Sequence, residues 1–283
     1  MKFVNPKNDV AFKKIFGNEQ HKEILISFLN AVLGLTGERE IAEVTLLNPY
    51  EAPKINLLKG TLLDVKAVDK QGVTFIVEMQ VENVIGLRKR FQYYVAKAYS
   101  SQIERGHDYP KLNQVIFIGI LNFSEFEGED YLTRHALLNC KTYKQELQDM
   151  ELNFIELPKF DKREDELETI LEKWVYFIKY APDLQMIPPH ANIPPLQTAY
   201  EVANSFGWSK EEMEIYDYRG IKMQDEQGAL DYAYQQGTEQ GMQQGVQKKA
   251  LEMAQKMLAK GYDLAEVAEL SGLPADVLAQ IGR

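Results

Sequence analysis

The chain has 283 residues, 45% of them hydrophobic and 11% aromatic, which is enough to bury a substantial core. Its formal net charge of −10 argues against a protein that coats nucleic acid through bulk electrostatics, although a local basic stripe can still handle phosphates. A single cysteine excludes an internal disulfide and fits a reducing cytoplasm, and the four histidines show no zinc spacing. The sequence has neither a signal-peptide pattern nor a run of membrane length, so we expect a cytoplasmic protein with no membrane partner.

The first half of the chain alternates between helical and strand patterns. Helical segments show apolar residues at spacings of three and four, whereas strands show alternation or short apolar runs. In chain order the patterns predict helix over 9–35 with a break near Gly17-Asn18, a strand over 41–49, a hairpin over 60–80, helix over 84–105 ended by Gly106, a buried central strand over 115–121 and a strand pair over 132–157.

The second half is predicted to be helical. Acidic helices are expected over 163–181 and 195–218, separated by a proline-rich stretch. Glycines then recur at positions 237, 241 and 245, which favours a weak helix or hinge because each glycine costs a helix about 1 kcal/mol. Helical periodicity returns over 248–281 with a helix–turn–helix outline, but the last helix lacks basic residues, so a plain helical hairpin is preferred. These patterns predict three parts, residues 1–160, 161–235 and 236–283.

Two carboxylates of the 60–80 hairpin are expected to face each other. A three-residue loop, Lys70-Gln71-Gly72, places glycine where a left-handed backbone is required, and Asp69 then faces Val73. Counting back along the arms sets Asp64 opposite Glu78, with Cβ atoms about 4.5–5.5 Å apart. Carboxylates at that separation repel each other, and a shared divalent cation is the obvious reason to place them together.

The alternation of the two arms agrees with this register. One face is apolar and the other is mostly polar, as expected of a hairpin with one buried side. The apolar face carries Leu63, Val65, Ala67, Val73, Phe75, Val77 and Met79, and the other carries Asp64, Lys66, Thr74, Glu78 and Gln80, with Val68 and Ile76 as apolar exceptions. The competing interpretation is a solvated strand face on which the two acids are incidental.

The order of these elements resembles the αβββαβ core of restriction-endonuclease-like proteins, which implies an α/β fold with a mixed sheet and, here, helical C-terminal extensions. The resemblance is specific at Asn8-Asp-Val-Ala-Phe-Lys-Lys-Ile-Phe16, Leu63-Asp-Val-Lys66, Glu78-Met-Gln80, and Arg90-Phe-Gln-Tyr-Tyr94 with Gln102 and Gly106-His-Asp-Tyr109. With the glycine-repeat tail, the chain resembles the PD-(D/E)XK nuclease family transposases, also called recombination-promoting (Rpn) nucleases. The match is strongest over residues 5–125.

This resemblance implies a Mg²⁺-dependent DNA endonuclease linked to recombination or mobile elements, with Mn²⁺ as a substitute ion. Asp64 would be the central metal ligand and Glu78 the second, which suits the preference of Mg²⁺ for hard oxygen ligands. Asp9 is a third candidate ligand, as a carboxylate of the first helix. Its position just before Val10 suits an N-cap equally well, and the two roles are compatible.

Gln80 departs from the superfamily pattern, in which lysine stands two residues after the second acid. A neutral amide can orient the attacking water but cannot supply a positive charge. Glutamine is tolerated at this place in the family that the chain resembles, so the departure does not by itself indicate a dead enzyme. Lys66 shares the polar face and could supply the charge, although a solvent-facing strand lysine is the preferred interpretation.

Four further residues are candidates for binding DNA. Arg90, Tyr94 and Lys97 share one helix face, from which the basic groups could contact the backbone and Tyr94 could stack or hydrogen-bond. The alternative is a helix that packs its tyrosines on the sheet. Lys13 could reach phosphate or pair with Asp9 one turn earlier.

The leading hypothesis is therefore a metal-dependent DNA nuclease with catalytic residues Asp64, Glu78, Gln80 and Lys66. A second hypothesis, favoured by Gln80, is a catalytically silent DNA-binding or assembly protein that keeps the fold. Action on RNA ranks last because no RNA-binding signature is present. Restriction-like nucleases often act as dimers, and a homodimer formed through the C-terminal helices is expected by analogy alone.

Overall fold

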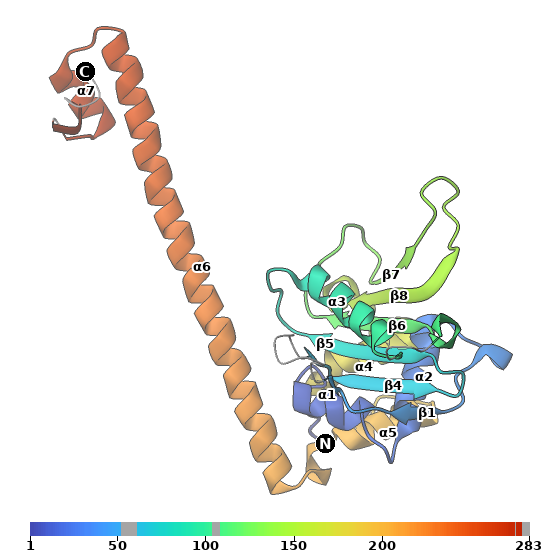
Figure 1. The fold of residues 1–283 in the computed structure, drawn as a ribbon. Coiled ribbons are helices and arrows are strands. Elements are labelled where there is room, and N and C mark those ends of the chain that lie inside the picture. Colours follow the sequence, from blue (N-terminus) through green and yellow to red (C-terminus); the bar gives the residue numbers. More distant parts are fainter. Residues whose placement is uncertain (52–60, 104–107, 275, 279–283) are drawn as a thin grey trace. The chain divides into compact units, whose positions relative to one another are not determined.

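The described chain consists of two compact units, residues 1–220 and 221–283. A computed structural model describes residues 1–51, 61–103, 108–274 and 276–278, and Figure 1 traces their elements. Within these ranges the first unit contains all of the strands. It is therefore the unit that carries the predicted hairpin.

A mixed six-stranded sheet forms the centre of the first unit, with strand order β1-β4-β5-β6-β8-β7. The β5–β6 and β6–β8 pairs are parallel, whereas the β1–β4, β4–β5 and β7–β8 pairs are antiparallel. The strands are β1 (Val44–Leu46), β4 (Val65–Asp69), β5 (Thr74–Gln80), β6 (Val115–Leu121), β7 (Leu132–Leu137) and β8 (Leu147–Glu156), and a separate ribbon pairs β2 (Tyr50–Glu51) with β3 (Thr61–Leu62).

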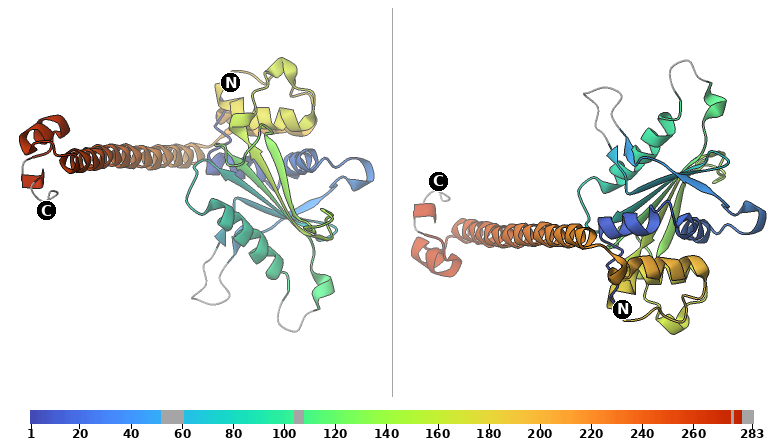
Figure 2. Two further views of the ribbon diagram at one scale, coloured as in Figure 1. Left: turned by 90° about the horizontal axis from the view of Figure 1, so that it is seen from above. Right: turned by 90° about the horizontal axis from the view of Figure 1, so that it is seen from below.

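Helices cover both faces of this sheet, as Figure 2 shows from two sides. One face packs against α1 (Asp9–Phe16), α2 (Lys22–Leu33), α4 (Ile170–Tyr180) and α5 (Pro194–Ala203), and the other packs against α3 (Leu87–Ser100). Aromatic residues fill both layers: Phe16 meets Trp174 in the first, and Phe91 meets Phe117 in the second. The predicted α/β fold with a mixed sheet is thus confirmed.

The hairpin forms with the predicted register. Gly72 has a φ of 87°, in the left-handed region that favours glycine, and the Asp69 N–H donates to the Val73 carbonyl over 3.1 Å. Val65 pairs with Val77, and one position further back the Asp64 N–H donates to Glu78 Oε1, so Asp64 lies beside Glu78. The prediction from loop chemistry and alternation is confirmed.

The burial of the hairpin differs from the prediction of one apolar and one mostly polar face. Ile76 is fully buried against α3, and every residue of β5 except Gln80 is buried, because α3 covers the face expected to be solvated. Leu63 also belongs to the α3 side rather than to the face of Val65, since β4 begins only after a bend at Asp64. A strand buried on both faces cannot be recognised from alternation alone.

Helix α3 and strand β1 are shorter than predicted, whereas the central strand and the 132–157 strand pair form as expected. The helix ends at Ser100 rather than near 105, and the expected cap, Gly106, lies outside the described residues. Gln102, just after the helix, donates to the Asn113 carbonyl over 2.9 Å and accepts from the Asn113 N–H over 2.7 Å. These bonds fasten the end of α3 to the loop before β6, so Gln102 has a structural role.

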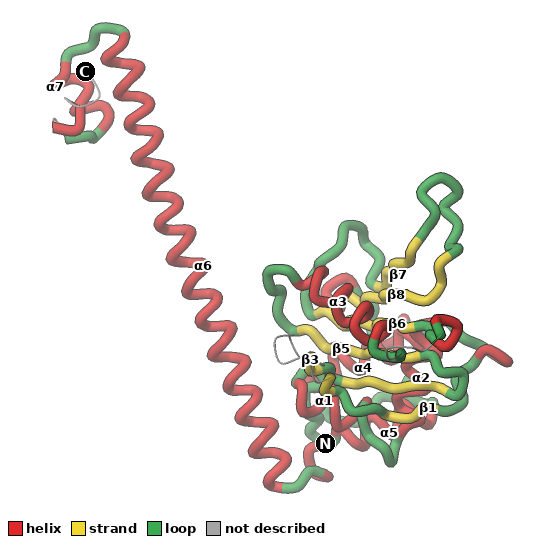
Figure 3. Tube along the Cα trace, viewed as in Figure 1, coloured by secondary structure: helices red, strands yellow, loops and turns green. Residues whose placement is uncertain are grey.

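The C-terminal helices also differ from the prediction. The expected 195–218 helix breaks at residues 204–209, and α6 (Lys210–Ala259) then runs without interruption through Gly237, Gly241 and Gly245. The structure thus shows a helix, the first of the two alternatives drawn from the sequence, since the glutamine, glutamate and methionine residues between the glycines are good helix formers and propagation is favourable. The second unit continues with α7 (Leu264–Ser271), and Figure 3 shows helix and loop but no strand among its described residues. Among the described helices, none is both long and apolar enough to cross a membrane.

Candidate active site

Asp64 and Glu78 hold each other in place through main-chain hydrogen bonds. The Asp64 N–H donates to Glu78 Oε1 over 3.0 Å, and the Met79 N–H donates to Asp64 Oδ2 over 3.0 Å. Glu78 is buried, and the Asp64 side chain is only 14% exposed. The two carboxyl groups therefore sit together in a shielded position just before β4 begins, beside the C-terminal end of β5.

Burial dominates the electrostatics of this pair. Loss of solvation, together with the neighbouring Asp64 charge, raises the pKa of Glu78 to about 8. Burial also raises the pKa of Asp64, against the opposing effects of the Met79 N–H and of Lys13. Two neighbouring acids with raised pKa values in one shielded site are typical of a functional centre, because such an arrangement destabilises the fold unless a ligand neutralises it.

Lys13 contributes a positive charge to the pair. Its Nζ lies 3.2 Å from Asp64 Oδ1, reaching the hairpin from α1. The pairing of Lys13 with Asp9 one turn away, one of the alternatives drawn from the sequence, is thus not what the structure describes. A contact between residues 13 and 64 has no signature in sequence spacing.

Asp9 lies apart from the other two candidate ligands. Its Oδ2 is 3.7 Å from Arg219 Nε, in the first turns of α6, and its Oδ1 accepts from the Val10 N–H over 2.9 Å. The expected N-cap role falls instead to Asn8, whose side chain accepts from Val10, while Asp9 is the first residue of α1. Asp9 still acts on Asp64 at longer range, since its charge helps to raise the pKa of that carboxyl.

Gln80 and Arg90 form the opposite border of the site. Gln80 follows Glu78 on the α3 face of β5, and its Oε1 accepts a hydrogen bond from Arg90 Nη2. The positive charge of the Arg90 guanidinium also lowers the pKa of Glu78, against the larger effect of burial. Its Nε is buried and has no hydrogen-bond partner. A positive charge from α3 thus stands beside the neutral amide.

The remaining candidates lie around this arrangement. The Tyr94 ring lies 5.9 Å from the Arg90 guanidinium, within cation–π range, and the charges of Glu78 and Asp64 help to raise its pKa after burial, the main cause. Lys97 follows on the same helix and is half-buried, as is Lys66 on β4. Arg90 and Tyr94 therefore belong to the site itself rather than to a separate outer surface.

The site can hold a metal only through a small set of carboxylates. In the described ranges no three Asp, Glu, His or Cys side chains gather closely enough to hold an ion, so Asp9 does not join Asp64 and Glu78 in one cluster. Two carboxylates are sufficient for Mg²⁺, which keeps several waters and takes further oxygens from substrate phosphate. The pair Asp64–Glu78 therefore fits such an ion.

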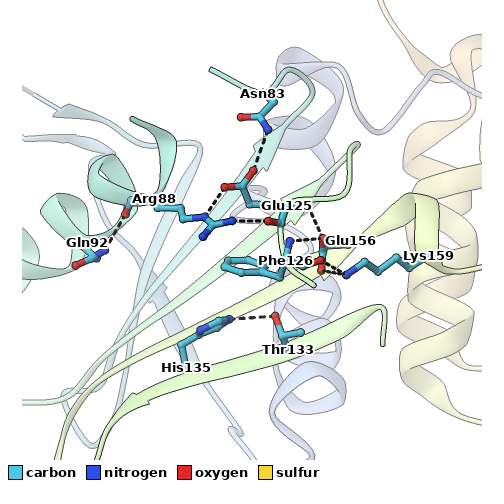
Figure 4. Close-up of polar contacts among 9 residues, drawn as sticks. All are labelled: Asn83, Arg88, Gln92, Glu125, Phe126, Thr133, His135, Glu156 and Lys159. Atoms are coloured by element: carbon cyan, nitrogen blue, oxygen red, sulfur yellow. Dashed lines mark hydrogen bonds and ion pairs between the residues drawn. The ribbon is translucent and has the colours of Figure 1, made fainter. Parts of the chain in front are cut away.

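A polar network beside the site was not predicted from the sequence. Glu125, in the loop after β6, accepts from Asn83 Nδ2 over 2.8 Å and from Arg88 Nε over 2.5 Å (Figure 4). The main chain of Glu125 is in turn held by buried Glu156, which pairs with Lys159 over 2.7 Å. The network ties the start of α3 to β8, across residues too far apart in sequence to be matched by pattern.

Two family models match the chain. One, described as PD-(D/E)XK nuclease family transposase, matches residues 6–233, and the other, described as Rpn/YhgA-like nuclease family, C-terminal HTH domain, matches residues 247–283. The second match corrects the preference for a plain helical hairpin over 248–281, whose basic residues were too few to indicate DNA binding. No curated protein and no solved structure matches. With most of its length covered, the chain belongs to the PD-(D/E)XK nuclease family transposases.

Proposed function

We propose that the chain is a divalent-metal-dependent DNA endonuclease that hydrolyses phosphodiester bonds, with Mg²⁺ as the expected ion and Mn²⁺ as a substitute. The observation that carries the proposal is the opposed, buried pair Asp64 and Glu78. Burying two acids side by side is costly, because their charged forms lose hydration and repel each other. A shared divalent cation removes both costs.

The donor set of the pair supports this assignment. Main-chain N–H groups hold Glu78 Oε1 and Asp64 Oδ2, which fixes both carboxyl groups before a ligand arrives. The Lys13 ammonium already places a positive charge beside Asp64 Oδ1. The bound ion would supply Lewis acidity to the scissile phosphate and lower the pKa of an attacking water. Lys13, released from Asp64 by that ion, would then be free to bind a phosphate oxygen.

Arg90 takes the place of the superfamily lysine in this proposal. Negative charge builds up on the phosphate oxygens during hydrolysis, and a fixed cation beside them stabilises the transition state. Gln80 cannot provide that charge, but its carbonyl oxygen holds Arg90 by a hydrogen bond. The unpaired, buried Nε–H of Arg90 is a donor available to a phosphate oxygen. Gln80 is then a positioning residue for Arg90.

The wider DNA contacts follow from the basic groups around the pair. Lys13, Arg90 and Lys97 are proposed to bind the backbone, with the Tyr94 ring orienting the Arg90 guanidinium. The segment matched as an HTH domain supports a second DNA contact. Because the family description joins nuclease and transposase, we place the cleavage in recombination or the movement of mobile elements.

The test is the nicking of supercoiled plasmid by the full chain with Mg²⁺, with Mn²⁺ and with EDTA. Asp64→Asn and Glu78→Gln should each lower the rate by about 100-fold or more, because each removes a metal ligand. Asp130→Asn, which changes an exposed acid of the same unit, is the matched control and should cut normally.

A wild-type chain that binds plasmid but never nicks it with either ion would support the catalytically silent alternative, in which Gln80 marks a lost activity. Normal cleavage by Asp64→Asn would overturn the assignment of the metal ligands. A parallel reaction with single-stranded RNA separates action on RNA from action on DNA.

A further inference from the structure

The loop between β5 and α3, residues 81–86, ends in an exposed apolar tip. Ile85 is completely exposed, with a relative accessibility of 108%, and its neighbour Val84 is 37% exposed. Single exposed apolar residues are common on protein surfaces and need no explanation by themselves. This tip differs from such residues because its loop is held by hydrogen bonds and follows directly after the candidate active site.

The tip stands on a loop held at both ends. At its start, Gln80 Nε2 donates to the Glu82 carbonyl over 2.6 Å, and Asn83 Nδ2 donates to Glu125 Oε2 over 2.8 Å. At its end, the Leu87 N–H donates back to the Val84 carbonyl over 3.1 Å. Gly86 turns the chain into α3 with a φ of 82°, a conformation that other residues rarely adopt. The loop is therefore a formed turn that presents Ile85 outward.

Glu125 connects this turn to the centre of the sheet. The Glu125 N–H donates to Glu156 Oε1 over 2.5 Å, and Glu156 is fully buried at the end of β8. Arg88, just after the tip, binds both the Glu125 carboxylate and its carbonyl, as Figure 4 shows. The bracket made by Asn83, Arg88 and Glu125 therefore holds the apolar tip against a rigid support, which a residue needs in order to push other groups apart.

Along the chain, the tip lies between Gln80 of the candidate active site and two basic residues, Arg88 and Lys89. Its base is Gln80, which holds Arg90 beside Glu78. Arg88, with a side chain 59% exposed, and exposed Lys89 follow the tip directly. An apolar point with cations next to it matches a partner with an anionic rim and an apolar stacked interior. Double-stranded DNA has both, and it is the substrate of the proposed function.

We infer that Ile85, with Val84 at its side, is a wedge that enters the base stack next to the phosphate held at Asp64 and Glu78. Apolar side chains inserted at a base step unstack it and kink the duplex, and the energy lost in unstacking is recovered through wider protein contact. Lys89 would bind a phosphate beside the opened step, while Arg88 keeps the tip braced on Glu125. The inference rests on the proposed function, since it requires DNA at the carboxylate pair.

The wedge predicts a structural preference in the substrate. Pyrimidine–purine steps such as TA and CA unstack most easily, and mismatched pairs cost less still. Cleavage should therefore concentrate beside such steps even without hydrogen bonds to base edges. Ile85 would then determine specificity without being a catalytic residue.

The test uses the full chain in Ca²⁺, with duplexes that carry 2-aminopurine at successive positions on either side of a central TA step. Wild type should raise the fluorescence at one or two positions severalfold, because 2-aminopurine brightens when it is unstacked. Ile85→Ser should lose that signal and bind the duplex about tenfold more weakly, since the burial of one aliphatic side chain is lost. Ile85→Leu should retain both properties.

Phe206→Ser is the matched control, since Phe206 is 82% exposed in the same unit and should change neither signal nor affinity. If wild type nicks plasmid while Ile85→Ser gives undiminished unstacking and affinity, the wedge is overturned and the nuclease function stands. If the wild-type chain neither binds nor cuts duplex DNA, the nuclease function fails and the wedge fails with it. A fluorescence change confined to Phe206→Ser would also contradict the inference.

Discussion

The Asp64 N–H donates a hydrogen bond to Glu78 Oε1 over 3.0 Å, so the main chain of Asp64 orients the side chain of Glu78. The reciprocal bond, from the Met79 N–H to Asp64 Oδ2, fixes the second carboxyl group. Both acids are thus held in place by hairpin backbone rather than by flexible side chains. Repulsion between their charges remains, and it sets the pH behaviour of the site.

Metal binding should release a proton at neutral pH. Burial and the Asp64 charge raise the pKa of Glu78 to about 8, so this carboxyl is largely protonated at pH 7 without metal, and an ion must displace the proton. The apparent affinity for Mg²⁺ or Mn²⁺ should therefore rise with pH up to about 8. Calorimetric titration in buffers of different ionisation enthalpy measures the proton count. Glu78→Gln is the control, and an unchanged proton release in this variant would contradict the assignment.

The same raised pKa predicts that Glu78 destabilises the metal-free fold at high pH. The pKa is about 8 in the folded chain and 4.5 ordinarily, so the folded state binds the proton more tightly and the free energy of unfolding falls as the pH rises between these values. Glu78→Gln, which cannot ionise, should therefore melt at a higher temperature than wild type at about pH 8.5 in EDTA. The difference should shrink towards about pH 4.5. A Gln variant that melts lower at both pH values would show that Glu78 stabilises the fold instead.

Removal of Arg90 should slow the chemical step more than it weakens DNA binding. Arg90→Met loses the cation beside Glu78, and the loss of one such donor typically lowers kcat by about 100-fold or more. Arg90→Lys should recover part of the rate, because lysine restores the positive charge but lacks the planar guanidinium that Gln80 holds by a hydrogen bond. Arg163→Met, at an exposed arginine, is the control. If Arg90→Met weakens DNA binding and leaves kcat unchanged, Arg90 is only a backbone contact.

Lys13 should compete with the metal for Asp64. Its ammonium lies 3.2 Å from Asp64 Oδ1, so Lys13→Met removes a resident cation, and the affinity for Mn²⁺ should rise about two- to fivefold, as expected for a partly exposed ion pair. Titration of Mn²⁺ followed by electron paramagnetic resonance measures this change at about pH 8. Lys22→Met, which breaks a comparable surface pair with Glu19, should leave the affinity unchanged. Weaker Mn²⁺ binding by Lys13→Met would contradict this competition.

The segment matched as an HTH domain should contribute affinity rather than chemistry. A chain that ends at residue 246 lacks the segment 247–283 and should bind DNA more weakly, with a shallower dependence of affinity on salt. Its nicking rate at saturating plasmid should stay within about twofold of wild type. Fluorescence anisotropy over a series of salt concentrations measures the first effect. An unchanged affinity would show that this segment binds something other than DNA.

The local features of the hairpin were determined by the sequence alone. Alternation and the left-handed Gly72 set the register, and the register placed Asp64 opposite Glu78, because hairpin geometry depends on residues close together in the chain. The apolar run over 115–121 likewise predicted a buried central strand. Boundaries that depended on packing, such as the end of α3 and the break before α6, were less predictable.

The surroundings of the pair were decided only by the tertiary structure. Lys13 on α1 forms an ion pair with Asp64, and Arg90 on α3 donates a hydrogen bond to Gln80. Arg219, in the first turns of α6, pairs with Asp9, which therefore does not join the two acids. Each contact joins elements whose distance and angle are set by how the helices pack on the two faces of the sheet. Sequence spacing carries no record of that packing, so the pairing of the two acids was predictable, whereas the contacts that Lys13 and Arg90 make around them were not.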